Sequence, residues 1–485
     1  MTAERPAVAP TSPPGLDHTP TFRLALDPAP ETLERLAAAL QGAGGGVEGL
    51  DLVEASQDRV VRDVTVSARD AVHAGQLAAL VGSLEGVELV SVSDRVLDVH
   101  AGGKISIATK VPVRTREDLA LVYTPGVARV CLAIHEQPDQ AYELTIKRNS
   151  VAVVSDGSAV LGLGDIGPAA AMPVMEGKAM LFKDFADVDA YPICLDERDP
   201  DRLVDIIEAL SVGFGGINLE DISAPRCFEV EGKLRQRLDV PVFHDDQHGT
   251  AIVVLAALYN AVRLVGKSVG PDLRVVVQGI GAAGTAVTNL LLAAGVVDVV
   301  GVDRNGIVTA RRKAARDPIF RRVGKQTNPR GLVGSKEVAL TGADVFVGVS
   351  AGNTLSARQL DLMADDAIVF AMANPVPEID PATARRRAAV VATGRSDEPN
   401  QINNVLCFPG LFRGLLDAGA REVNDDVKLA AAAAIAGIVR PGQLSADSII
   451  PSPLNRAVVP AVAQAVVDAA QDTGAARRRD PTVLR

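Results

Sequence analysis

The feature that most restricts the fold of this chain is a glycine-rich turn between two apolar strands. The segment "LRVVVQGIGAAGTAVTNLLLAAGVVDVVGVD" begins with an unbroken apolar run, turns at Gly279, Gly281 and Gly284, and continues through an Ala-rich helix into a second strand. A G-x-G-x-x-G sequence with a strand before it and a helix after it is typical of dinucleotide-binding folds. We therefore predict an α/β chain with a Rossmann-type dinucleotide-binding domain.

Each glycine has a physical role in this turn. Gly279 permits the tight turn, Gly281 lets the backbone approach a pyrophosphate, and Gly284 allows the helix to pack on the strand. The N-terminus of the helix supplies N–H groups to the anion. The predicted cofactor contacts in the turn are Gly279, Ile280, Gly281, Ala282, Ala283 and Gly284.

The strand after the turn ends at Asp303, about 20 residues beyond the motif. Its carboxylate would accept hydrogen bonds from the adenosine ribose and repel a 2′-phosphate, which favours NAD over NADP. Three arginines follow closely and could neutralise a 2′-phosphate, so NADP stays open as the alternative cofactor. They are Arg304, Arg311 and Arg312.

Two later strand ends belong to the same predicted sheet. "VFVGVSAGNT" and "AIVFAMANP" are apolar runs that end in small and polar residues. Because ligands bind at the carboxyl ends of strands in open α/β sheets, these residues should face the nicotinamide half of the dinucleotide. The predicted contacts are Ser350, Gly352 and Asn374.

At 485 residues the chain is too long for one hydrophobic core, and changes in pattern divide it into five parts. Residues 1–20 are Pro-rich and expected to be disordered. Residues 21–101 alternate as strand, helix, two strands, helix and a closing strand in "VELVSVSDRVLDV", the βαββαβ order of a ferredoxin-like unit. Residues 102–250 and 251–401 are predicted to be an α/β substrate and metal domain and the NAD-binding domain. Residues 402–485 should form helices that pack back on the substrate domain. The active site is expected in the cleft between the substrate domain and the NAD-binding domain.

Composition excludes several classes of partner. The formal net charge of −11 argues against nucleic acid or an anionic membrane, because binding to either requires basic patches. The four cysteines lie far apart, so we expect reduced thiols in a cytoplasmic protein. The N-terminal segment has no apolar region typical of a secretory signal, and no apolar run is long enough to span a membrane.

The segment "VFHDDQHGT" has almost the spacing of the zinc-protease motif H-E-x-x-H. That motif requires a helix, because both histidines must lie on one helix face. Here His244 follows the β-branched and aromatic run "VPVF", and helical character begins only after Gly249, with Thr250 as a plausible N-cap. We therefore expect a strand end and a loop, and the acids between the histidines become the candidate ligands.

Acidic residues end two neighbouring predicted strands. "GGINLEDISAP" contains Glu220 and Asp221, and "VPVFHDD" ends in Asp245 and Asp246. Parallel strands end at one edge of the sheet, so these carboxylates should gather there and raise one another's pKa. A divalent cation removes that penalty, and oxygen ligands suit Mg²⁺ or Mn²⁺ better than Zn²⁺. The alternative is solvated acids at two loop starts.

Seven motifs follow one another from about residue 102 to the C-terminus. They are "YTPGVA", "SDGSAVLGLGDIGP", "PVMEGKAMLFK", "GGINLEDISAPRCFEVE", "VFHDDQHGTAIV", "MANPVPEI" and "GRSDEPNQINNVLCFPG". Together they closely resemble the short bacterial malic enzymes. The resemblance implies oxidative decarboxylation of L-malate to pyruvate and CO₂, with reduction of NAD(P)⁺ and dependence on Mg²⁺ or Mn²⁺. The N-terminal unit looks like an ACT domain, a regulatory small-molecule sensor; a dimerisation domain without a ligand is the alternative.

The same resemblance implies roles for the acids. Glu220, Asp221 and Asp246 match the metal ligands, and Asp245 matches a neighbouring acid with a supporting role in catalysis. One departure concerns the loop after Asp156, which lacks the Arg that grips a malate carboxylate in larger, animal-type members. The carboxylate anchor is therefore left unassigned.

The resemblance also implies an acid and a base. Lys178 matches the lysine that takes the proton from the malate hydroxyl, and Tyr123 matches the acid that protonates the enolate carbon. A lysine can act as a base only with a depressed pKa, through desolvation or nearby positive charge. The implied malate contacts are Tyr123, Lys178, Asn374 and the pair Asn403 and Asn404.

Three other readings remain. Malolactic chemistry would retain the dinucleotide and release lactate, a metal-independent α/β dehydrogenase would act without the cation, and a sensor would bind the dinucleotide and an effector without turnover.

Enzymes of the implied family are homodimers or larger, so Tyr123 is a candidate to enter the site of a partner subunit. A small-molecule effector is expected at the ACT-like domain.

Overall fold

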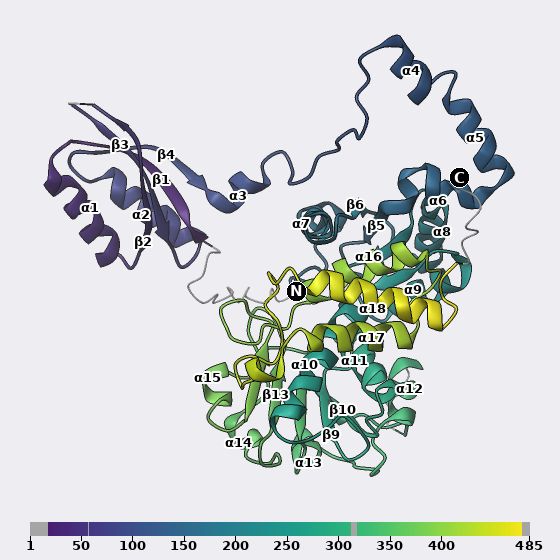
Figure 1. The fold of residues 1–485 in the computed structure, drawn as a ribbon. Coiled ribbons are helices and arrows are strands. Elements are labelled where there is room, and N and C mark those ends of the chain that lie inside the picture. The colour runs from purple at the N-terminus through teal and green to yellow at the C-terminus, as the bar shows by residue number, and fades with distance from the viewer. Residues whose placement is uncertain (1–17, 57, 312–317, 478–485) are drawn as a thin grey trace, which may run out of the picture. The chain divides into compact units, whose positions relative to one another are not determined.

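The computed structural model describes residues 18–56, 58–311 and 318–477, and the chain divides into two compact units, residues 1–106 and 107–485 (Figure 1). Most of the predicted Pro-rich tail, residues 1–17, lies outside the described residues. No described helix is long and apolar enough to cross a membrane. The four cysteines are free thiols, and Cys227 and Cys407 are buried.

The first unit is one antiparallel sheet with strand order β2-β3-β1-β4 and two helices that share its core. Phe22 and Leu24 of the central strand β1 pack together with Leu36 of α1 and Leu77 of α2. The elements follow the predicted βαββαβ order. They are β1 (Pro20–Leu26), α1 (Pro30–Gly42), β2 (Gly46–Ala55), β3 (Val60–Ser67), α2 (Ala71–Gly82) and β4 (Val87–Asp94).

The closing strand of this unit is shorter than predicted. β4 ends at Asp94, and Arg95–His100 forms the helix α3, where the sequence predicts that the strand continues through "RVLDV". The Asp94 carboxylate accepts hydrogen bonds from the N–H groups of Val96 at 2.8 Å and Leu97 at 3.3 Å. An N-cap of this kind satisfies the free donors of a first helical turn, which explains why the strand stops here.

The second unit contains a smaller, four-stranded parallel sheet with strand order β6-β5-β7-β8. Its strands are β5 (Ser150–Ser155), β6 (Asp189–Cys194), β7 (Gly216–Leu219) and β8 (Val242–His244). The connecting helices are α7 (Pro168–Ala186), α8 (Pro200–Ser211) and α9 (Arg226–Arg237). Helix α7 begins five residues before the predicted run "PVMEGKAMLFKDFA" and carries Pro173 inside it.

A six-stranded sheet forms the second half of this unit, with strand order β11-β10-β9-β12-β13-β14 and all neighbours parallel except β11. Its strands are β9 (Arg274–Gln278), β10 (Asp298–Asp303), β11 (Gly306–Ile307), β12 (Val345–Gly348), β13 (Ile368–Ala371) and β14 (Val390–Thr393). Its helices are α11 (Ala282–Ala293), α12 (Pro318–Gln326), α13 (Lys336–Leu340), α14 (Ala357–Leu360) and α15 (Pro381–Ala384). The parallel strands and the helix after β9 are those expected for a Rossmann-type domain.

Helix α10 (Thr250–Leu264) connects the two sheets and is buried along most of its length. The C-terminal helices α16 (Phe408–Ala418), α17 (Asp425–Gly437) and α18 (Val458–Asp472) complete the same core. Phe408 and Phe412 of α16 contact Phe182 of α7, with ring centroids 4.7 and 5.4 Å apart. The C-terminal segment therefore lies against the helix that follows β5 of the smaller sheet.

The segment before β5 is packed very differently. It contains α4 (Arg116–Val122), α5 (Val127–Glu136) and the short α6 (Ala141–Leu144), and none of these helices has a buried residue. Apolar side chains such as Ile107, Leu121 and Leu132 are exposed. Most apolar residues of this segment therefore lack the burial that normally stabilises a helix in a globular protein.

Candidate active site

The four acids predicted from the strand ends lie together. Strand β7 pairs in parallel with β8, with Leu219 opposite His244, so the residues that follow the two strands share one edge of the sheet. The N–H of Asp221 donates a hydrogen bond of 2.8 Å to Asp246 Oδ2. Glu220 and Asp245 are held by a common partner from α7.

That partner is Lys178, whose side chain is 7% exposed. Its Nζ donates to Glu220 Oε1 at 2.7 Å and to Asp245 Oδ2, and lies 4.3 Å from the ring centroid of Phe408. Burial opposes the charge of Lys178, but the carboxylates outweigh this effect and raise the pKa of the ammonium group. The depressed pKa that a base requires is thus absent while only these carboxylates surround Lys178.

For the acids, burial and the charge of neighbouring carboxylates both disfavour the ionised form. Burial, followed by the charge of neighbouring carboxylates, raises the pKa of Glu220 to about 7 and that of Asp221 to about 8. Burial also raises the pKa of Asp245 to about 7. Asp221 Oδ2 and Asp245 Oδ1 are buried without a hydrogen-bond partner in the described part of the chain.

These orphaned carboxylate oxygens fit the chemistry of a hard divalent cation, which takes oxygen ligands and offsets clustered negative charge. The geometry is not that of an assembled metal site. Among residues 18–56, 58–311 and 318–477, no three Asp, Glu, His or Cys side chains form a group that could hold a metal ion. Two of the four acids bind the Lys178 ammonium group instead.

One member of the predicted asparagine pair reaches the acids. Asn404 Nδ2 donates a 2.7 Å hydrogen bond to Asp245 Oδ2, the same atom that binds Lys178. The Asn403 side chain instead accepts from the N–H of Val405 at 3.0 Å and caps the short helix that follows it. The sequence cannot tell which of the two asparagines reaches the acids, because this depends on the direction in which each side chain points.

The residues Asp245–Gly249 form one π-helical turn, η4, between β8 and α10. The expected loop is therefore wrong, and so is the expected N-cap. Gly249 already has helical backbone angles, with φ −61° and ψ −48°, and Thr250 is the first residue of α10 without a side-chain cap before it. Single π-helical turns of this kind occur frequently at functional sites.

The two histidines of this stretch differ in their surroundings. His248 Nε2 lies 2.8 Å from Glu231 Oε1, and Gln247 Nε2 donates to Glu231 Oε2 at 3.2 Å. His244 is fully buried, and burial lowers its pKa to about 4. Its Nδ1 is 3.7 Å from Asp246 Oδ2, which is beyond hydrogen-bond distance.

Glu231, which bonds to Gln247 and His248 of η4, was missed by the sequence interpretation. It is buried on α9 together with Cys227, Val230 and Leu234, so it occupies the apolar face of that helix. A charged residue at that spacing is the signal that could have identified it. Burial opposes its ionisation, but the charge and hydrogen bond of His248 lower the pKa of Glu231 to about 2.

Two arginines lie at the base of the loop that lacks the expected Arg. Asp156 is fully buried, forms an ion pair with Arg226, and lies 3.7 Å from Arg198 Nη1. The N–H of Ala159 donates to the carbonyl of Asp221 at 3.0 Å, which ties this loop to the acids. Arg198 and Arg226 were not predicted as site residues.

The dinucleotide turn has the backbone geometry that its glycines predict. Gly279 has a φ of +98°, and a Cβ on Gly284 would lie 1.7 Å from the carbonyl oxygen of Gly279. A Cβ on Gly281 would meet no atom within 4 Å. Ala282 packs against the hydrophobic core that the smaller sheet shares with α8 and α9.

The other predicted cofactor contacts lie at strand ends of the larger sheet. Asp303 Oδ1 accepts from the N–H of Asn305 at 2.7 Å. The N–H of Ser350 donates to Glu378 Oε1 at 3.0 Å, and Asn374, after β13, is exposed. Arg312, one of the candidates for a 2′-phosphate contact, lies outside the described residues.

Tyr123 is not brought to Lys178 within one chain. It follows α4, and 66% of its surface is exposed. Within the described ranges no hydrogen bond or ring contact involves its side chain. The predicted acid therefore has no neighbour from the carboxylate cluster.

Comparison with known proteins gives consistent matches. The family model "Malic enzyme, N-terminal domain" matches residues 102–235, and "Malic enzyme, NAD binding domain" matches residues 247–471. The chain is 56% identical over 458 residues to the NAD-dependent malic enzyme of Geobacillus stearothermophilus, an alignment that covers 94% of this chain and 95% of the relative. It is 51% identical over 391 residues to the bifunctional malic/malolactic enzyme of Bacillus subtilis, covering 80% and 95% of the two chains. The solved structure of the NAD-dependent malic enzyme from Thermotoga maritima is 48% identical, with a TM-score of 0.74 over 76% of this chain and 98% of that one.

Proposed function

The chain belongs to the malic enzyme family, and from this premise we propose that it converts L-malate to pyruvate and CO₂ with reduction of NAD⁺. The observation that carries the proposal is the buried cluster in which Lys178 binds both Glu220 and Asp245. This cluster combines a candidate base with oxygen ligands for Mg²⁺ or Mn²⁺, and the dinucleotide turn packs against the same sheet.

In this proposal Lys178 accepts the proton of the malate hydroxyl as the alcohol is oxidised. When bound, the dinucleotide supplies the hydride acceptor and the divalent cation supplies a Lewis acid that polarises the keto oxygen. Lys178 is buried, and burial alone lowers its pKa; its protonated form is stabilised first by Asp245 and then by Glu220 and Asp246, two of the proposed cation ligands. Asp245 holds the ammonium group in position, and Asn404 holds Asp245.

The decarboxylated enolate needs a proton at carbon, and we assign its donation to the hydroxyl of Tyr123. We propose a homodimer in which Tyr123 enters the site of the partner subunit. The exposure of Tyr123 supports this arrangement, as do the apolar residues of α4 and α5 that the chain itself leaves unburied. Apolar surface of this kind is typical of subunit interfaces.

The remaining predictions complete the proposal. The preference for NAD rests on Asp303, and malate contacts are assigned to Asn374 and Asn404, with Asn403 retained as a prediction. The N-terminal βαββαβ unit is proposed to be an ACT-like regulatory domain that binds a small-molecule effector. We expect the protein in the cytoplasm.

The test is an incubation with L-malate, NAD⁺ and Mn²⁺, in which free NADH and pyruvate are both measured. Equal amounts of the two products are expected, with turnover lost in EDTA and restored by Mn²⁺. Malolactic conversion is the second candidate, because the relative from Bacillus subtilis is named as bifunctional. Lactate formed without free NADH would favour it over the oxidative reaction.

A further inference from the structure

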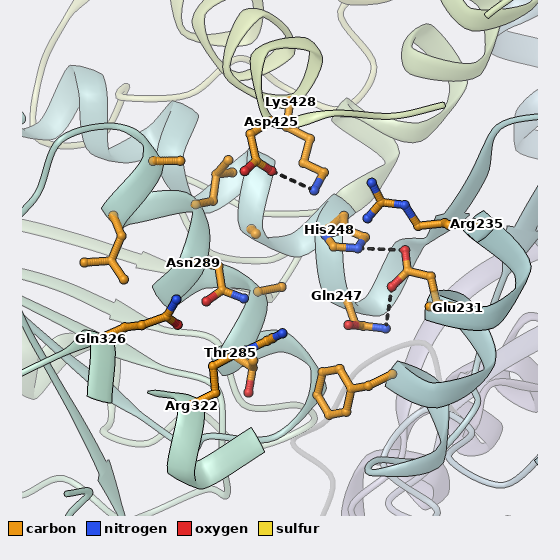
Figure 2. A pocket seen from close by; sticks show the side chains of 17 residues that line it. Glu231, Arg235, Gln247, His248, Thr285, Asn289, Arg322, Gln326, Asp425 and Lys428 are labelled. Atoms are coloured by element: carbon orange, nitrogen blue, oxygen red, sulfur yellow. Dashed lines mark hydrogen bonds and ion pairs between the residues drawn. The ribbon is translucent and has the colours of Figure 1, made fainter. Parts of the chain in front are cut away.

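A cavity of about 510 Å³ lies between α9, η4, α11, α12 and α17 (Figure 2). Its wall includes Glu231 and Arg235 of α9, Thr285 of α11, Arg322 of α12 and Lys428 of α17. None of the residues assigned to malate, the cation or the dinucleotide lines it. The cavity is therefore separate from the proposed active site, and its volume is within the range of small-molecule sites.

The acidic side chains of this cavity are already paired. Glu231 accepts hydrogen bonds from His248 and Gln247, and Asp425 lies 3.1 Å from the Lys428 ammonium group. Two guanidinium groups are left without an acidic partner at bonding distance in the described part of the chain. Among the described residues, Arg235 bonds only to the carbonyl of Val423, at 3.2 Å, and Arg322 takes part in no hydrogen bond or ion pair. The cavity consequently has an excess of positive charge.

The two guanidinium groups lie at different ends of the cavity. Figure 2 shows Arg322 beside Thr285, with the amides of Asn289 and Gln326 along the same side, while Arg235 lies across the cavity near Lys428. Thr285 is 1% exposed, and its Oγ1 has no hydrogen-bond partner within the described ranges. A buried hydroxyl without a partner is costly unless a ligand or water completes its hydrogen bonds. These groups suit a short molecule with an anionic group at each end, since guanidinium groups bind carboxylates in a two-pronged geometry.

One wall of the cavity belongs to the turn that carries the catalytic acids. Gln247 and His248 line the cavity, and both belong to η4, as do Asp245 and Asp246. Glu231 fixes the two cavity-lining side chains of this turn from α9. A ligand that packs against Gln247 and His248 could shift the backbone of η4. Because Asp245 and Asp246 belong to the same turn, their carboxylates would move with it.

We propose that this cavity is a second binding site for a small dicarboxylate, held by Arg235 and Arg322, and that its occupation changes the affinity of the η4 acids for a divalent cation. Coupling between two sites is reciprocal, so the cation must change the affinity of the dicarboxylate by the same factor. A change of about fivefold or more in each affinity is expected.

The experiment measures binding of succinate, which lacks the oxidisable hydroxyl, by isothermal titration calorimetry of the full chain. The wild type and Lys178→Ala should both bind succinate, and Arg322→Ala should weaken binding about tenfold or more, the loss expected for a charged hydrogen bond. Arg321→Ala changes the neighbouring residue of α12, which does not line the cavity, and serves as the matched control. Arg235→Ala tests the other end of the cavity.

The coupling is measured by titrating Mn²⁺ with and without saturating succinate, again by calorimetry. The fivefold shift is expected in the wild type and should be absent in Arg322→Ala. The proposal is overturned if Lys178→Ala abolishes succinate binding while Arg322→Ala retains it, because succinate then occupies the malate site. Absence of binding, binding of inorganic phosphate but not succinate, or binding without a shift in Mn²⁺ affinity would each also overturn it.

Discussion

Lys178 Nζ lies 2.7 Å from Glu220 Oε1, and both side chains are buried at the edge of the smaller sheet. In the metal-free protein the ammonium group is the main compensation for a cluster of carboxylates. Lys178 therefore has two separable contributions, one to the reaction and one to the stability of the carboxylate cluster.

Replacing Lys178 with Met, a chain of similar length without charge, separates these contributions. Turnover should fall by about 10²–10⁴-fold, the usual effect of removing a positioned base. In EDTA the free energy of unfolding should fall by about 3–5 kcal/mol, because a buried ion pair loses one partner. Thermal unfolding in EDTA and in Mn²⁺ measures the second effect; equal stability of variant and wild type in EDTA would contradict it.

Asp246→Asn tests the choice of acids over histidines in "VFHDDQHGT". The variant should fold normally and require at least about 10–100-fold more Mn²⁺ for turnover, the loss usual for a residue that only supports a ligand, because an amide keeps the shape but loses the charge. His244→Ala and His248→Ala serve as comparisons, since the former removes a buried neutral ring and the latter a partner of Glu231. If either histidine variant loses more Mn²⁺-dependent turnover than Asp246→Asn, the ligand assignment is wrong.

The raised pKa values of Glu220, about 7, and Asp221, about 8, predict how stability depends on pH. In the unfolded chain these groups titrate near their ordinary values of 4.5 and 3.8, so between about pH 4 and 8 the folded protein binds more protons. Their stabilising contribution is present below this window and is lost as the pH rises through it. Metal-free protein should therefore become less stable from pH 5 to 8, and Mg²⁺ should stabilise it more at pH 8 than at pH 6.

The matched control for this pH dependence is Asp221→Asn, which removes an acid whose pKa is raised from 3.8 to about 8. Its metal-free stability should vary less between pH 5 and 8 than that of the wild type. A wild-type protein whose melting temperature is unchanged over this range in EDTA would show that the pKa values of these acids are not raised in the folded state.

Asp303→Ser tests cofactor choice. Serine keeps a hydrogen-bonding group for the ribose and removes the charge that repels a 2′-phosphate. The ratio of kcat/KM for NAD⁺ to that for NADP⁺ should fall by about tenfold or more, corresponding to about 1.4 kcal/mol. An unchanged ratio would assign the preference to the arginines that follow Asp303.

The shared site is tested by mixing two inactive proteins, Tyr123→Phe and Lys178→Ala. In a heterodimer one of the two sites would contain both wild-type residues, so random subunit exchange should restore about a quarter of the wild-type sites. Exchange itself is followed by mass spectrometry of differently tagged subunits. Proven exchange without recovered activity would mean that Tyr123 acts within its own chain.

The sequence was most informative where function depends on backbone geometry and strand order. The glycine motif predicted a tight turn, and in the structure a Cβ on Gly279 or Gly284 would clash with neighbouring backbone, whereas a Cβ on Gly281 would meet no atom within 4 Å. The acids that follow β7 and β8 were predicted to meet because parallel neighbours end at one edge. Both features follow from the local sequence pattern and from the general geometry of parallel sheets, so a single sequence is enough to predict them.

Features that depend on side-chain direction or on partners far along the chain were not predicted. Glu231 meets His248 and Gln247 across two helices, and Asn404 rather than Asn403 turns toward Asp245. The helix at Arg95–His100 replaces a predicted strand because the Asp94 side chain caps it. In each case one hydrogen bond decides between alternatives that have similar local propensities.

The turn at Asp245–Gly249 has an implication for insertions and deletions. A π-helical turn holds about one residue more than an α-helical turn, so it can lose a residue and still continue as helix. Such a deletion would rotate everything before it by about 100° relative to α10. The fold would tolerate this change as a continuous helix, but Asp245 and Asp246 would no longer face Lys178. The number of residues in this turn therefore determines where the two acids point, even though the helix itself would form with one residue fewer.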